Sequence, residues 1–148
     1  MQPMELIEIL LVEDNPGDIR LTQEALGEGR LLNRLHVVMD GEEALDFLHQ
    51  RGKYAQAVWP DLILLDLNLP KLNGQEVLAA VKGDPKLRKI PVIVLTTSEA
   101  EKDILHSYSL HANSYIVKPV SLEKFVKVIA SLRDYWFSVV KLPPSGER

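Results

Sequence analysis

Three carboxylates follow runs of apolar residues, at the points where the chain would leave a buried strand. Glu13 and Asp14 come after Leu6–Val12, and Asp66 comes after Leu62–Leu65. A carboxylate in that position is costly to desolvate unless a cation or hydrogen-bond donors satisfy it. Carboxylate oxygens are hard ligands of the kind that Mg²⁺ prefers, and bound Mg²⁺ can share a substrate phosphate. If the three side chains converge, they predict a Mg²⁺ and phosphate site.

A hydroxyl and an ammonium end two further apolar runs. Thr96 follows Val92–Leu95, and Lys118, which precedes Pro119, follows Tyr115–Val117. Taken singly, an acidic residue after a strand is more often a helix cap, and a lone Thr or Lys is more often structural or solvated. Five such residues at the ends of successive strands instead favour one phosphate-and-metal site.

The elements that must position these side chains alternate along the chain. Five short apolar runs lack a two-residue alternation, which is typical of strands buried on both faces of a parallel sheet. The runs are Leu6–Val12, Leu35–Met39, Leu62–Leu65, Val92–Leu95 and Tyr115–Val117. Amphipathic segments lie between them, and helix-start signals occur at Asn15–Pro16, at Ser98 with Glu101, and at Ser121.

This alternation predicts an α/β fold with a doubly wound, five-stranded parallel sheet in the order 2-1-3-4-5. Such sheets bind ligands beyond the carboxyl ends of the strands, where the strand order reverses between strands 1 and 3. That switch point would bring Glu13, Asp14 and Asp66 together.

Length and composition limit the remaining possibilities. The chain has 148 residues, a net charge of −4 and no cysteine. We expect one domain over residues 1–148, with a core from about 6 to 140 and a tail at 141–148. The charge offers no broad attraction to nucleic acid or to an anionic membrane. The absence of a signal peptide and of a long apolar stretch predicts a cytoplasmic protein.

Four segments resemble the receiver domain of two-component response regulators: "LLVEDNPGD", "PDLILLDLNLPKLNG", "IPVIVLTTS" and "SYIVKP". The resemblance extends from about Leu6 to Val140 and implies a flavodoxin-like (CheY-like) fold. It implies that the chain is a stand-alone regulator rather than an enzyme in its own right. Asp66 would accept a phosphoryl group from a phosphohistidine of a partner sensor histidine kinase, with Mg²⁺-dependent self-phosphorylation and autodephosphorylation.

The same resemblance implies roles for the other site residues. Glu13, Asp14, Asp66 and the backbone carbonyl of Asn68 would bind Mg²⁺. The Thr96 hydroxyl and the Lys118 ammonium would each contact a phosphoryl oxygen, and Tyr115 would be the switch aromatic. The Lys118–Pro119 bond would be cis.

Finer features resemble the single-domain regulators of cyanobacterial phytochromes. These features are the long connection at 50–59, "LTTS", "SLHANSYIVKP" and the aromatic "DYWF". Three positions depart from the usual receiver pattern. Thr97 stands where many receivers have Ala or Gly beside the phosphate. Glu13 replaces the commoner Asp, and the turn before the fifth strand has no Gly, although Asn113 can adopt a left-handed conformation.

Competing interpretations are weaker. A haloacid-dehalogenase-type phosphatase needs a second Asp where this chain has Asn68, and a flavodoxin-type FMN site needs a Ser/Thr/Gly-rich loop where it has "EDNPGD". A receiver-fold scaffold that binds partners without phosphorylation stays open. Tyr135 and Phe137 lie on either side of the apolar stripe of the last helix, so they also predict a homodimer interface.

Overall fold

The computed structural model describes residues 6–27, 32–97 and 112–135. Its elements, in chain order, are β1 (Ile7–Val12), α1 (Pro16–Gly27), β2 (Asn33–Val38), α2 (Gly41–Leu48), the 3₁₀ turn η1 (Gly52–Tyr54), β3 (Leu62–Asp66), α3 (Gly74–Gly83), β4 (Val92–Thr96), β5 (Ser114–Val117) and α5 (Leu122–Tyr135). The helix start predicted at Ser98 and the tail at 141–148 lie outside the described residues.

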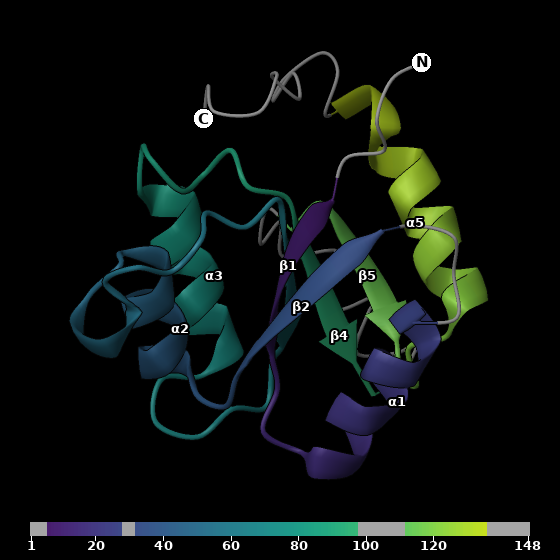
Figure 1. Ribbon diagram of the computed structural model, residues 1–148, viewed down its shortest axis with the longest axis horizontal. Coiled ribbons are helices and arrows are strands. Elements are labelled where there is room, and N and C mark those ends of the chain that lie inside the picture. Colours follow the sequence, from purple (N-terminus) through teal and green to yellow (C-terminus); the bar gives the residue numbers. More distant parts are fainter. Residues whose placement is uncertain (1–5, 28–31, 98–111, 136–148) are drawn as a thin grey trace.

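The five strands form one sheet in the order β2-β1-β3-β4-β5. All four strand pairings are parallel. Helices α2 and α3 cover one face of the sheet, and α1 and α5 cover the other (Figure 1). The predicted doubly wound α/β fold and its strand order are therefore confirmed.

Strands β1, β3 and β4 contribute buried side chains to both faces of the sheet. Successive side chains of a strand point to opposite faces. In β1, Leu10 and Val12 belong to the core cluster beneath α2 and α3, whereas Ile9 and Leu11 belong to the cluster beneath α1 and α5. This two-sided burial is the reason that the strands read as continuous apolar runs.

Helix caps form where the sequence signals them. The Asn15 side chain accepts a hydrogen bond from the Asp18 N–H at 3.0 Å. Helix α1 begins at Pro16, directly after Asn15. The Ser121 hydroxyl accepts a hydrogen bond from the Lys124 N–H at 3.2 Å ahead of α5. These caps fix where each helix starts relative to the strand before it.

One local prediction is corrected. The second apolar run includes Met39, but β2 ends at Val38 and Met39 is 45% exposed, because the chain turns there into the N-cap of α2. Asn113, for which the sequence allows a left-handed conformation, is not among the described residues with positive φ. Its side-chain oxygen instead accepts hydrogen bonds from the Val92 N–H and from Lys82 Nζ. Lys82 Nζ also donates to the carbonyls of Arg88 and Ile90, so this amine ties α3 to the start of β4.

A close backbone approach joins α3 to the end of β3. A Cβ on Gly74 would lie 2.4 Å from the Asp66 carbonyl oxygen and 2.5 Å from Leu67 Cα. The Gly74 N–H donates to the Leu67 carbonyl at 3.0 Å. Only a residue without a side chain fits this contact, which holds the first turn of α3 against the Asp66 backbone.

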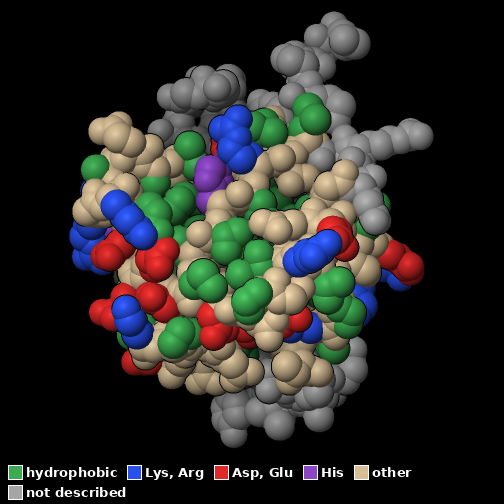
Figure 2. Space-filling model, turned by 60° about the horizontal axis from the view of Figure 1, so that its bottom comes forward, with side chains coloured by type: hydrophobic (Ala, Val, Ile, Leu, Met, Phe, Trp, Pro, Cys, Tyr) green, Lys and Arg blue, Asp and Glu red, His purple; other side chains and the backbone are tan. Residues whose placement is uncertain are grey.

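The surface of the described residues is mixed in character. With the lower end of Figure 1 turned forward, Asp and Glu side chains lie among Lys and Arg, and hydrophobic side chains reach the surface between them (Figure 2). Leu21 on α1 and Met39 are among the exposed large hydrophobic residues. Within the described residues, no helix combines the length and the apolar character needed to span a bilayer.

Candidate functional site

The carboxyl ends of the strands place the predicted residues at one edge of the sheet. Asp66 is the last residue of β3 and is 3% exposed, and Glu13 follows β1 and is 1% exposed. The neighbouring strands β1 and β3 are in register through Val12 and Leu65, so the residues that follow each of these are adjacent. The parallel sheet thus delivers two buried carboxylates to the switch point.

Asp14 completes an acidic cluster. Carboxylate oxygens of Glu13, Asp14 and Asp66 lie within 4.8 Å of one another. Glu13 Oε1 is buried and has no hydrogen-bond donor among the described residues. It lies 2.8 Å from Lys118 Nζ as an ion pair. The hard oxygen donors and the unsatisfied buried oxygen fit a divalent cation.

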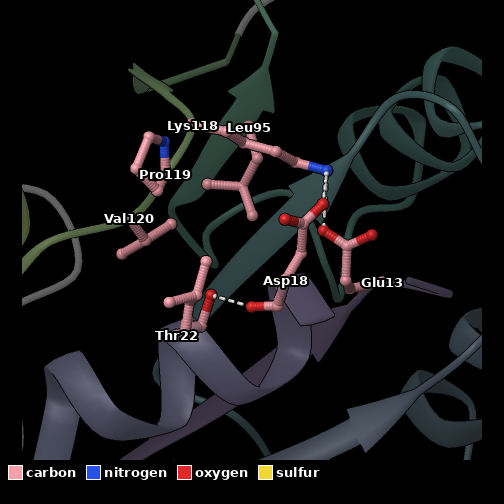
Figure 3. A pocket seen from close by; sticks show the side chains of 8 residues that line it. Glu13, Asp18, Thr22, Leu95, Lys118, Pro119 and Val120 are labelled. Carbon is pink, nitrogen blue, oxygen red and sulfur yellow. Dashed lines mark hydrogen bonds and ion pairs between the residues drawn. The ribbon is translucent and has the colours of Figure 1, made fainter. Parts of the chain in front are cut away.

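Lys118 neutralises part of this charge. Its ammonium nitrogen lies 2.8 Å from Glu13 Oε1, 3.0 Å from Asp66 Oδ2 and 3.0 Å from Asp18 Oδ2. Figure 3 shows the side chain reaching from the end of β5 toward Asp18 and Glu13. Burial alone would lower the pKa of Lys118, but the carboxylates of Glu13, Asp66 and Asp18 outweigh burial and raise it. The ammonium is therefore charged at neutral pH.

The surroundings of Glu13 disfavour its charged form, in contrast to those of Lys118. Burial raises the pKa of its carboxyl to about 7, and the neighbouring Asp66 adds to the rise, while Lys118 offsets part of it. Like charges in a desolvated site are costly, so one member of the cluster holds its proton more tightly than usual. A cation bound between Glu13 and Asp66 would remove that cost.

The other predicted site residues occupy the expected elements. Thr96 is the last residue of β4 and is 1% exposed, and its carbonyl accepts a hydrogen bond from the Lys118 N–H at 2.7 Å. The Asn68 N–H donates to Asp66 Oδ1 at 3.2 Å. Tyr115 lies in β5, half-buried against the core beneath α2 and α3, and burial raises its pKa. The Lys118–Pro119 peptide bond is cis, as predicted.

Sequence reasoning missed Asp18. It lies in the first turn of α1, four residues after Asp14, and it lines a small pocket of about 180 Å³ with Thr22, Lys118 and Val120 (Figure 3). The available signal was its position: side chains in a helix tilt toward the N-terminus, so a carboxylate in the first turn points back to the strand end. It was overlooked because acidic residues in a first turn usually just stabilise the helix.

The predicted dimer interface cannot be placed. Phe137 lies outside the described residues, and only the backbone of Tyr135, the last residue of α5, is described. The interface therefore stays a prediction.

Comparison with known proteins identifies the class that this fold and site define. Residues 9–130 match the response regulator receiver domain family. The match covers most of the chain, so the protein belongs to that family and is a receiver domain of a two-component system.

Three relatives are similar over nearly the whole chain. Response regulator Rcp1 of Synechocystis sp. is 47% identical over 135 residues, which cover 91% of this chain and 92% of that protein. The Mn²⁺-bound structure of Rcp1 superposes with a TM-score of 0.72 at 46% identity, covering 93% and 99% of the two chains. The phosphorylated cyanobacterial phytochrome response regulator RcpA gives a TM-score of 0.74 at 50% identity, covering 95% and 100%. The bacteriophytochrome response regulator RtBRR gives 0.82 at 46% identity, covering 96% and 86%.

Proposed function

We propose that this receiver domain accepts a phosphoryl group on Asp66 from a phosphohistidine of a sensor histidine kinase. The supporting observation is the convergence of three carboxylates within 4.8 Å, with the Lys118 ammonium 3.0 Å from Asp66. An acidic cluster and a fixed cation at one strand edge suit phosphoryl transfer, which depends mainly on positioning and on neutralising charge.

The transfer forms one bond to phosphorus and breaks another. A carboxylate oxygen of Asp66 attacks phosphorus, an O–P bond forms, and the P–N bond to the donor imidazole breaks. The imidazole nitrogen keeps the bonding electrons and takes up a proton from solvent. A carboxylate oxygen attacks through a lone pair and has no proton to lose, so the nucleophile needs no general base. The Asn68 N–H, 3.2 Å from Asp66 Oδ1, orients the attacking carboxylate.

Glu13, Asp14, Asp66 and the backbone carbonyl of Asn68 are the groups that would hold Mg²⁺. The bound metal supplies positive charge to the phosphoryl oxygens during transfer. Lys118, the residue after β5, supplies the second positive charge. The Mn²⁺-bound structure of the relative Rcp1 supports a divalent cation at this site.

Thr96 and Tyr115 would convert the new charge into a change of shape. The Thr96 hydroxyl donates a hydrogen bond to a phosphoryl oxygen and moves inward, and the Tyr115 ring occupies the space that it leaves. Such a coupling biases an equilibrium between two conformations. The half-buried position of Tyr115 on β5, in the strand next to β4, supports this pairing.

The partner kinase is proposed to be of the phytochrome type, and the output to include homodimerisation. The phytochrome link is supported by RcpA and RtBRR, whose names assign them to phytochromes and which are 50% and 46% identical to this chain. The mixed polar and apolar surface in Figure 2 offers contacts suited to a partner protein.

The test uses acetyl phosphate as a small phosphoryl donor with Mg²⁺ and intact-mass measurement. We expect one added phosphoryl group on the wild type and none on Asp66→Asn, whose amide is nearly isosteric but a poor nucleophile. Chelating the metal should also stop incorporation. A folded wild type that gains no phosphoryl mass, or an Asp66→Asn variant that gains as much as the wild type, would refute the proposal. The first result would favour a scaffold that is not phosphorylated.

A further inference from the structure

Asp18 is fixed where it faces the Lys118 ammonium. Its N–H donates to the Asn15 cap at 3.0 Å, and its carbonyl accepts a hydrogen bond from the Thr22 hydroxyl at 2.9 Å. These two contacts hold the backbone of the first turn of α1 on both sides of the residue. The carboxylate points from that turn toward Lys118 (Figure 3).

Three carboxylate oxygens surround the ammonium at 2.8–3.0 Å, and it donates hydrogen bonds to Asp18 and Asp66. An ammonium has three hydrogens to donate. Because carboxylate oxygens already crowd the ammonium, a phosphoryl oxygen added on Asp66 has to share Lys118 with Asp18 and Glu13. Asp18 Oδ2 and Asp66 Oδ2 are both 3.0 Å from the same nitrogen, so a phosphoryl group on Asp66 would lie close to the Asp18 carboxylate and compete with it for Lys118.

Exposure decides which carboxylate is released. The side chains of Glu13 and Asp66 are 1% and 4% exposed, whereas that of Asp18 is 32% exposed. A carboxylate that leaves its counter-ion must be solvated by water instead, which is costly for a buried group and less costly for one that is about a third exposed. Asp18 is therefore the partner that Lys118 loses most easily.

We propose that Asp18 is a positioning residue that holds Lys118 in the unphosphorylated state and competes with the phosphoryl group for it, thereby slowing phosphorylation. This inference rests on the proposed function of Asp66. The carboxylate acts in two ways: it occupies the ammonium, and it adds a negative charge beside the path of an anionic donor.

The experiment measures the rate of phosphoryl incorporation from acetyl phosphate at saturating Mg²⁺, at low and at high salt. Asp18→Asn removes the charge with little change of shape, and Asp18→Glu keeps it. Glu24→Gln is the matched control, since Glu24 also lies on α1 but pairs with Arg20 at an exposed position. Circular dichroism verifies that each variant is folded.

We expect Asp18→Asn to be phosphorylated about three- to tenfold faster than the wild type at low salt, with the ratio falling toward one at high salt. Asp18→Glu and Glu24→Gln should match the wild type. A purely structural role for Asp18 would give no gain in rate and no salt dependence of the ratio. An Asp18→Asn rate equal to or below that of the wild type overturns the inference.

A second measurement needs no variant. In the wild type, the carboxyl carbon resonance of Asp18 should shift to that of a solvated aspartate when Asp66 is phosphorylated, and an unchanged resonance contradicts the proposed release. Failure of the inference differs from failure of the proposed function: in the latter case the wild type gains no phosphoryl group at all.

Discussion

Replacing Gly74 by Ala should disturb the site through the backbone of Asp66. The new Cβ would lie 2.4 Å from the Asp66 carbonyl oxygen, while ordinary contacts begin at 3.4 Å, so helix and strand end must separate by about 1 Å. Both neighbouring atoms belong to the backbone, so no flexible side chain can yield. Overpacking of this kind costs about 1–3 kcal/mol of unfolding free energy.

The same displacement acts on the nucleophile. A misplacement of about 1 Å in a reacting group can lower a rate by roughly 10²-fold. We therefore expect Gly74→Ala to lower both the midpoint of urea unfolding and the rate of phosphorylation by acetyl phosphate. The two effects have one cause, the separation of α3 from the end of β3, so they should appear together.

Gly83 provides the control at the other end of the same helix. A Cβ there meets nothing within 4 Å. Gly83→Ala should leave the phosphorylation rate unchanged and should be neutral or stabilising by up to about 1 kcal/mol, since Ala favours a helix more than Gly does. Wild-type stability and rate in Gly74→Ala would refute the reasoning, because the contact would then be absorbed without moving Asp66.

The remaining predictions concern metal, packing and assembly. Because the pKa of Glu13 is about 7, protons should compete with the cation, and calorimetry should show metal affinity falling up to tenfold per unit below that pH. Since this pKa exceeds its ordinary value of 4.5, the metal-free protein should lose stability as the pH rises from about 4.5 through 7. Asp14→Ala should weaken metal binding more than Glu13→Gln does, and equal affinity for wild type and Asp14→Ala would exclude Asp14 as a ligand. Lys82→Met should cost about 2–4 kcal/mol in urea unfolding, because three oxygen acceptors lose a charged donor. In light scattering at micromolar concentrations, the wild type should dimerise and Tyr135→Ala/Phe137→Ala should not; a wild type that stays monomeric in both phosphorylation states contradicts that interface.

The strands and the acidic cluster were predictable because they depend on patterns that local sequence carries. Strands buried on both faces must be apolar throughout, so β1, β3 and β4 are visible as runs. Parallel strands end at a common edge, which is sufficient to bring Glu13, Asp14 and Asp66 together.

Other features depend on contacts between distant segments and were not predictable. The Asn113 side chain accepts hydrogen bonds from Val92 and Lys82, 21 and 31 residues away. Asp18 pairs with a residue 100 positions later. No local pattern distinguishes such a carboxylate from one that merely stabilises a helix start.

The reach of Lys118 across the sequence has a consequence for folding. Its partners Asp18 and Asp66 lie 100 and 52 residues earlier in the chain. Every strand pairing within residues 6–27, 32–97 and 112–135 is parallel, so none of these pairings can form as a local hairpin. As the chain leaves the ribosome, its clustered acids are made long before the lysine that offsets their repulsion. The ion pairs of this site can therefore form only when the segments that carry Asp18, Asp66 and Lys118 have all been made and have come together.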